Sequence, residues 1–237
     1  MQRIMGAMRR AITDYSMIEE GDHIAVGVSG GKDSLALLVG LARLSEFCSP
    51  KYNLTALSVD PCFGGKDADY SAVAALCAQL GVPLVIRRTD LWDILFVRRE
   101  ETHPCSLCAR MRRGMLHNMA REAGCNKIAL GHHKDDAVAT FLMNLLYEGR
   151  VGCFQPVSYL SRKELTMIRP LCLCDERDIV SAAKKAQLPV MAKSCPVDGH
   201  TARQKTRDWL TSMEKSDYPG LGKRLFGALR RGHISKW

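Results

Sequence analysis

Ser29-Gly30-Gly31-Lys32-Asp33-Ser34 lies between an apolar run at residues 23–28 and a second apolar run that begins at Leu35. Two adjacent glycines allow positive φ values and a close approach of the backbone to a ligand. The first N–H groups of a helix beginning here lack intrahelical partners, and phosphate is their natural ligand. The spacing differs from the Walker A pattern, which needs four residues between its first glycine and Gly-Lys. The stretch therefore predicts a phosphate-binding turn between a buried strand and a helix.

Short apolar runs alternate with segments of helical length along the chain. We expect strands at residues 23–28, 55–59, 84–86 and 127–130, and helices at 33–46, 70–80, 104–123 and 135–147. This alternation predicts an α/β fold with a doubly wound, mainly parallel sheet. Ligands of such sheets bind beyond the carboxyl ends of the strands. The glycine turn, Asp60 and Gly131-His132-His133 each follow a strand, so we expect them to converge.

Charge is concentrated near the end of the chain. The 237 residues carry a net charge of +9, and residues 201–237 hold nine Lys or Arg against three acidic residues. Such a cluster favours a polyanion partner. We expect two basic amphipathic helices, separated at Pro219-Gly220, that dock on the core or on a second copy of the chain. This divides the sequence into a domain of residues 1–200 and a basic extension of residues 201–237.

Hydropathy indicates a protein without a membrane span. With 46% hydrophobic and 25% charged residues the chain can form a sizeable core. No apolar run is long enough to cross a bilayer, and the N-terminal residues lack the apolar core of a signal peptide. We therefore expect a cytoplasmic protein with reduced thiols, despite its ten cysteines.

A cysteine pair occurs in Pro104-Cys105-Ser106-Leu107-Cys108, which places two sulfurs one helical turn apart at the start of a helix. The helix dipole and the following Arg110 and Arg112 favour thiolates there. Metal, cluster and redox chemistry all stay open for this pair, since structural zinc would ordinarily require further ligands. In contrast, Cys172 and Cys174 lie in a strand-like apolar run and are expected to pack in the core.

Two aspartates follow two histidines in Gly131-His132-His133-Lys134-Asp135-Asp136. One aspartate is sufficient to cap the helix predicted to begin there. The second carboxylate exceeds that need, and a pair of carboxylates at this edge of the sheet is suited to Mg²⁺.

Together these motifs resemble the tRNA 2-thiocytidine synthetase family of the ATP pyrophosphatase (PP-loop) superfamily. The cysteine stretch is the specific part, because the sister tRNA-lysidine synthetases share the ATP loop without it. The resemblance covers roughly residues 20 to 200 and implies an adenine nucleotide alpha hydrolase-like fold. It rests on Ser29 to Ser34, Pro104 to Gly114, Gly131 to Asp136, Tyr147-Glu148-Gly149-Arg150 and Ile168-Arg169-Pro170-Leu171, in that order.

The resemblance implies an ATP-dependent tRNA sulfurtransferase. A pyrimidine C2 oxygen would attack the α phosphorus of ATP, giving an adenylate and pyrophosphate. Sulfide on the free iron of a [4Fe-4S] cluster would then displace AMP, with 2-thiocytidine at tRNA position 32 as the implied product. A cysteine desulfurase or free sulfide would supply the sulfur.

The site residues implied by the resemblance form three sets. The cluster ligands are Cys105, Cys108 and Cys195. The carboxylates for Mg²⁺ are Asp33, Asp135 and Asp136, and together with Lys32, which would neutralise phosphate charge, they form the catalytic set. The ATP-binding residues are Ser29, Gly30, Gly31, Lys32, Asp33 and Ser34 in the loop, Asp60 at the adenosine, and Gly131 and His132.

The sequence departs from the family pattern at two positions. Asp198 stands where the family usually carries a further cysteine after Cys195, and this removes a candidate persulfide carrier while leaving three cluster ligands. Ala139 stands where the family tends to carry glutamate, which bears on metal handling and on the substrate.

Three other functions stay open from the residues alone. One is a zinc-stapled PP-loop enzyme that makes lysidine or 2-thiouridine. The second is a non-catalytic RNA-binding module that uses the basic extension. The third is a sulfur-handling enzyme that acts on a small nucleobase.

Overall fold

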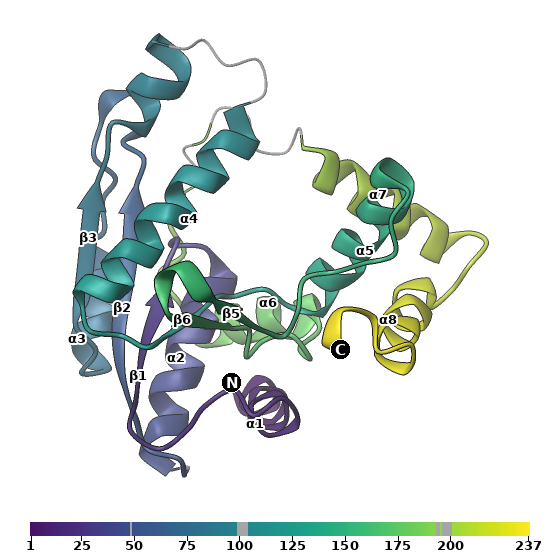
Figure 1. The fold of residues 1–237 in the computed structure, drawn as a ribbon, viewed down its shortest axis with the longest axis horizontal. Coiled ribbons are helices and arrows are strands. Elements are labelled where there is room, and N and C mark those ends of the chain that lie inside the picture. The colour runs from purple at the N-terminus through teal and green to yellow at the C-terminus, as the bar shows by residue number, and fades with distance from the viewer. Residues whose placement is uncertain (48, 99–103, 193–194, 196–200) are drawn as a thin grey trace.

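The computed structural model describes residues 1–47, 49–98, 104–192, 195 and 201–237, and a six-stranded sheet lies at its centre (Figure 1). The strand order is β3-β2-β1-β4-β6-β5. Every neighbouring pair is parallel except the last, β6 and β5, which is antiparallel. The strands are β1 (Asp22–Gly27), β2 (Tyr52–Asp60), β3 (Leu84–Arg88), β4 (Lys127–Ala129), β5 (Val157–Leu160) and β6 (Leu165–Ile168). The predicted mainly parallel sheet is confirmed.

Helices connect and cover these strands. The four helices expected between residues 33 and 147 are present within a few residues of their predicted ends. Helices α1 and α6 and the β5–β6 pair had no counterpart in the sequence prediction. None of the described helices is long and apolar enough to cross a bilayer. The α-helices are α1 (Gln2–Asp14), α2 (Lys32–Phe47), α3 (Ser71–Gln79), α4 (Pro104–Glu122), α5 (Lys134–Glu148), α6 (Glu176–Lys185), α7 (Ala202–Lys215) and α8 (Leu221–Arg231).

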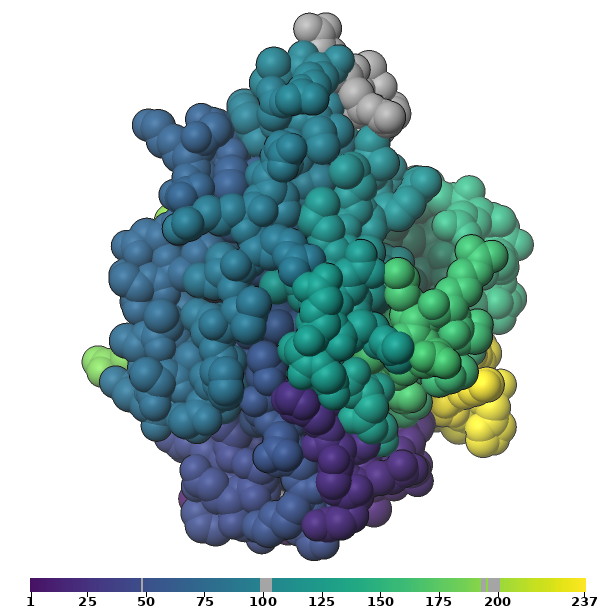
Figure 2. Space-filling view, turned by 60° about the vertical axis from the view of Figure 1, so that its left-hand side comes forward, coloured from purple at the N-terminus to yellow at the C-terminus, as the bar shows by residue number. Residues whose placement is uncertain are grey.

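The four inner strands of the sheet are buried on both faces, whereas the edge strands β3 and β5 are partly exposed. Side chains alternate along a strand, so Ile24 and Val26 of β1 enter one core while Ala25 enters the other. Helices α1, α2, α3 and α6 contribute to the first core, and α4 with the π-helical segment Asp93–Arg98 contributes to the second. Figure 2 shows the α4 face in teal, with the green residues around β5 and β6 beside it. The doubly wound architecture is therefore confirmed.

The two C-terminal helices pack against the rest of this chain. Helices α7 and α8 contact α5, on the right of Figure 1, and Phe226 and Leu229 of α8 are buried. The Trp237 indole N–H donates to the Phe154 carbonyl over 2.7 Å, and its ring meets Tyr15 edge-on. The expected docking on the core is confirmed, whereas a second copy and a domain boundary at residue 200 stay predictions.

One local expectation is wrong. Residues 171–174 form a turn rather than a strand, because β6 ends at Ile168 and Pro170 has no N–H to donate to a ladder. Cys172 N donates to the Arg169 carbonyl over 3.0 Å, and Cys174 N donates to the Leu171 carbonyl over 2.8 Å. Both thiols are buried, so their expected packing role is confirmed.

A buried ion pair fixes β4 beside β1. The Lys127 ammonium lies 2.8 Å from the Asp22 carboxylate, and both side chains are buried. Lys127→Met would leave the Asp22 charge without its cation, so we expect the free energy of unfolding to fall by about 3 kcal/mol. Urea denaturation measures the change. The control is Arg87→Met at the exposed Arg87–Glu122 pair, for which we expect less than about 1 kcal/mol. Equal effects of the two variants would contradict the prediction.

Candidate active site

The glycine loop is closed by the hydroxyl of Ser34. Its Oγ accepts from Ser29 N at 3.1 Å and donates to the Gly31 carbonyl at 2.9 Å. Gly30 has φ +78°, a conformation that favours glycine, and a Cβ there would collide with the Met191 sulfur. The predicted turn between strand and helix is confirmed, because β1 ends at Gly27 and α2 begins at Lys32.

The end of β4 lies against this loop. A Cβ on Gly131 would be 3.1 Å from the carbonyl carbon of Asp33 and 3.2 Å from Ser34 N. The missing side chain therefore allows the segment after β4 to touch the first turn of α2. This contact brings the glycine loop together with His132, His133 and the aspartates of α5, as the sequence predicted.

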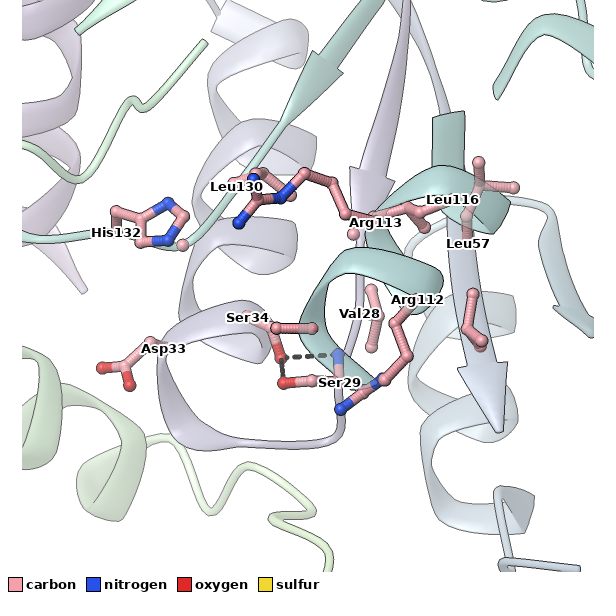
Figure 3. Close-up of a pocket in the computed structure, with 14 residues that line it drawn as sticks. Val28, Ser29, Asp33, Ser34, Leu57, Arg112, Arg113, Leu116, Leu130 and His132 are labelled. Atoms are coloured by element: carbon pink, nitrogen blue, oxygen red, sulfur yellow. Dashed lines mark hydrogen bonds between the residues drawn. The ribbon is translucent and has the colours of Figure 1, made fainter. Parts of the chain in front are cut away.

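A cavity of about 370 Å³ opens beside the loop. Ser29, Asp33 and Ser34 line one side, and His132 lines another (Figure 3). Arg112 and Arg113 of α4 reach over it, and Figure 3 shows Arg112 directed toward Ser29 and Arg113 toward Leu130. The volume lies in the range of small-molecule sites. Apolar walls with two guanidinium groups above an N–H-rich loop suit a nucleotide phosphate chain. The remaining lining residues are Gly27, Val28, Leu57, Val59, Ala109, Leu116, Leu130 and Gly131.

Carboxylates from three helices meet next to the cavity. Asp33 belongs to α2, Asp135 and Asp136 to α5, and Glu176 to the first turn of α6. Lys32 joins two of these helices, since its ammonium lies 2.9 Å from Asp33 and 2.8 Å from Glu176. The Asp135 carboxylate also accepts from Glu176 N at 2.8 Å. Carboxylate oxygens are the ligands that Mg²⁺ prefers. Among the described residues, no three ligand atoms of this group lie mutually within 4.8 Å, so an ion shared by three of them requires the side chains to move.

A buried histidine occupies the middle of this group. The ring nitrogens of His133 lie 3.5 Å from Asp135 and 3.4 Å from Asp136, and 1% of the side chain is exposed. Burial lowers the pKa of His133, but the bond to Asp135 and the charges of Asp136 and Asp33 raise it above its ordinary value overall. Burial alone would raise the pKa values of Asp135 and Asp136. Their interactions with His133 act in the opposite direction, and the pKa of each carboxylate is lowered overall. We conclude that the carboxylates are ionised at neutral pH.

His132 differs from its neighbour in charge. Burial, reinforced by the charge of Arg169, lowers the pKa of His132 to about 4. Its ring packs against Phe154, and its buried Nδ1 has no hydrogen-bond partner among the described residues. His132 is therefore a neutral imidazole at pH 7 that lines the cavity, and its unpartnered Nδ1 is buried.

Sequence reasoning missed Glu176 and the arginines Arg203 and Arg207. Arg207 contacts Asp136 at 2.8 Å and Glu176 at 3.2 Å, and Arg203 lies 3.5 Å from Asp136. They come from α6 and α7, far along the chain from the glycine loop. Arg207 was counted in the basic extension, but no local pattern distinguishes it from its solvent-facing neighbours.

The carboxylate of Asp60 is buried and accepts hydrogen bonds from the backbone. It is buried at the end of β2, and its two oxygens accept from Cys62 N at 3.0 Å and Ala68 N at 2.9 Å. It is not among the described residues that line the cavity. Asp60 therefore shapes the loop after β2, and its predicted contact with adenosine gains no support from this geometry.

The cysteine pair occupies the first turn of α4, one turn before the arginines of the cavity. Burial raises the pKa of the Cys108 thiol, Arg112 opposes the shift, and Cys195 and Cys105 add to it. The charge of Cys195 therefore acts on Cys108, and the three-cysteine ligand set stays a prediction. Among the described residues, only Asp60, Cys62 and Asp67 have three ligand atoms mutually within 4.8 Å. The sulfurs of Cys105, Cys108 and Cys195 do not form such a group, and their shared ligand stays a prediction.

The remaining buried thiols are expected to be unreactive. Burial raises the pKa of Cys172 and of Cys174 to about 12, which leaves a thiolate fraction of about 10⁻⁴ at pH 8. In protein stripped of metal, iodoacetamide should label exposed Cys105 at least about a hundredfold faster than either buried thiol. Mass spectrometry of timed samples measures the rates, and labelling in denaturant is the control. Comparable native rates would contradict the assignment of Cys172 and Cys174 to packing.

Comparison with known proteins agrees with this geometry. The PP-loop domain family model matches residues 4–212. The chain is 38% identical to a tRNA-cytidine(32) 2-sulfurtransferase of Geobacter sulfurreducens, over 96% of this chain and 89% of that protein. It is 39% identical to a protein of the same name from Syntrophotalea carbinolica, over 93% and 85% of the two chains.

A solved structure shares the fold. The U34-tRNA thiolase NcsA from Methanococcus maripaludis, determined with its [4Fe-4S] cluster, superimposes with a TM-score of 0.79 at 24% identity. The match covers 97% of this chain and 77% of that one. On the family match and the curated relatives, the chain belongs to the PP-loop domain family and, within it, to the family of the tRNA-cytidine(32) 2-sulfurtransferases.

Proposed function

We propose that the chain is an ATP-dependent tRNA sulfurtransferase that forms 2-thiocytidine, at position 32 as the names of its relatives indicate. One observation carries the proposal. Helix α4 bears Cys105 and Cys108 in its first turn and, one turn later, Arg112 and Arg113 in the wall of the cavity beside the glycine loop. A single helix therefore joins a sulfur site to a phosphate site.

ATP binding follows from the loop and its surrounding charges. The N–H groups of residues 29–34 and the N-terminus of α2 would bind phosphate, with Gly30 and Gly31 allowing the close approach. Lys32, Arg112 and Arg113 would neutralise phosphate charge. Asp33, Asp135 and Asp136 would hold Mg²⁺ on the pyrophosphate through their carboxylate oxygens. The lowered pKa values of Asp135 and Asp136 suit this role.

Activation of the base requires a dry, oriented pocket. Leu57, Leu116 and Leu130 line the cavity and would exclude water from the adenylate. The C2 oxygen of cytidine attacks the α phosphorus, pyrophosphate leaves, and the oxygen becomes part of a good leaving group. His132, neutral at pH 7, lines the cavity and would contact the base or the nucleotide without adding charge.

Cys105, Cys108 and Cys195 would hold a [4Fe-4S] cluster. Three cysteines would leave one iron of the cluster without a protein ligand. When bound, the cluster would supply the sulfur that replaces the activated oxygen. The role of Arg112 is twofold, because its charge acts on Cys108 while its side chain lines the cavity.

The partners follow from the same chemistry. The exposed Lys215 of α7, Lys223, Arg224 and Arg231 of α8, and Arg110 of α4 are suited to tRNA phosphates. A cysteine desulfurase or free sulfide would replenish the sulfur, and we expect the reaction in the cytoplasm, where tRNA is available. A homodimer stays a prediction.

The phosphate role of Lys32 can be measured. Lys32→Met should lower tRNA-dependent formation of AMP and pyrophosphate about tenfold to a hundredfold, because a hydrogen bond from a charged group contributes about 1.5–3 kcal/mol. The control Lys66→Met removes the same charge from an exposed position in the loop after β2. Unchanged turnover in Lys32→Met, or an equal loss in both variants, would contradict the role.

The cluster can be measured independently of turnover. Protein purified without oxygen should contain about four irons and four acid-labile sulfides per chain, and Cys195→Ala should lose them. Cys62→Ala, a substitution at a half-buried thiol of another loop, should retain them. Zinc in place of iron would favour a zinc-stapled enzyme that makes another tRNA modification. Full iron content in Cys195→Ala would remove that cysteine from the ligand set.

A further inference from the structure

Arg207 is held by the carboxylates of the site rather than by solvent. Its guanidinium bridges Asp136 Oδ1 at 2.8 Å and Glu176 Oε2 at 3.2 Å. A quarter of the side chain is exposed, and its buried Nε has no hydrogen-bond partner among the described residues. The printed contacts of Arg207 with Glu176, Asp136 and the His133 ring nitrogen use at most three of its five N–H donors, so the guanidinium can take a further acceptor.

The phosphate site lies within reach of Arg207. Glu176 accepts from Lys32 through one oxygen and from Arg207 through the other. The two cations are thus neighbours across a single carboxylate, and Lys32 also opens the helix that follows the glycine loop. An anion that draws the Lys32 ammonium lies close to the Arg207 guanidinium as well.

We propose that Arg207 is a phosphate-binding residue that exchanges partners during the reaction. In the nucleotide-free enzyme Arg207 neutralises Asp136 and Glu176. When Asp136 takes Mg²⁺ and ATP occupies the loop, Arg207 leaves Asp136 and binds the pyrophosphate end of the nucleotide. This inference rests on the proposed function, because it assumes that the loop binds ATP and that Asp136 binds Mg²⁺.

The charges of the site favour this exchange. Four carboxylates, Asp33, Asp135, Asp136 and Glu176, are paired with Lys32, Arg207, the more distant Arg203 and the buried His133. A divalent cation on the aspartates neutralises them in place of Arg207. The complex of Mg²⁺ with ATP is negatively charged, so it attracts the released guanidinium. A guanidinium binds two phosphate oxygens through two parallel N–H groups. Arg207 can form this contact once it has left its carboxylate partner.

The exchange predicts shifts of opposite sign in one variant. In Arg207→Gln holoenzyme, calorimetry should show Mg-pyrophosphate bound about tenfold or more weakly, because a charge-assisted contact is lost. AMP binding should be unchanged, since AMP lacks the pyrophosphate end. Mn²⁺ titrated without nucleotide, followed by electron paramagnetic resonance, should bind several-fold more tightly because its competitor on Asp136 has been removed.

Two further variants control for charge and for folding. Lys205→Gln removes one positive charge from an exposed position on the same helix, and should change none of the three affinities. Arg207→Lys keeps the charge and should recover part of the Mg-pyrophosphate affinity. Loss of AMP and Mg-pyrophosphate binding by equal factors, or no gain in Mn²⁺ affinity, would show that Arg207 merely anchors α7 and would overturn the inference.

The inference and the proposed function fail in different ways. If the unmodified holoenzyme binds neither Mg-pyrophosphate nor Mg-ATP, the proposed function is wrong. If it binds both and Arg207→Gln binds them equally well, the function stands and the role of Arg207 falls.

Discussion

The backbone contact between Gly131 and the first turn of α2 is the constraint on which the site depends. Strands β1 and β4 are parallel neighbours, so their carboxyl ends meet, and the missing side chain of Gly131 lets the two following segments touch without displacing either. Helix α5 then begins beside the glycine loop, and its aspartates face Asp33. The anion-binding loop and the carboxylates are therefore positioned by sheet geometry rather than by flexible loops.

The second organising feature is charge balance across distant segments. Lys32 and Arg207 come from opposite ends of the sequence, yet both form an ion pair with Glu176. Like charges on the aspartates of α5 and on Asp33 would repel one another in a half-buried site, so the cations that separate them are part of the folded structure. The packing of α7 on α5 thus serves the site as well as the core.

Local patterns in the sequence predicted the elements from residue 23 to residue 148, because apolar periodicity and the glycine loop are short-range signals. They also identified the cysteines, the loop and the aspartates that the fold brings together. Glu176 and Arg207 escaped detection because a charged residue on an amphipathic helix looks the same whether it faces solvent or a neighbouring helix. Residues 171–174 were misassigned because an apolar run does not distinguish a buried turn from a buried strand.

Helix α4 sets both the separation and the relative orientation of its two functional ends. Successive residues of an α-helix are rotated by about 100° and rise by about 1.5 Å, so Cys108 and Arg112 lie on nearly the same side, one turn apart. Inserting or deleting a single residue between them would turn one site away from the other without unfolding the helix. The length of this stretch is thus constrained together with its composition.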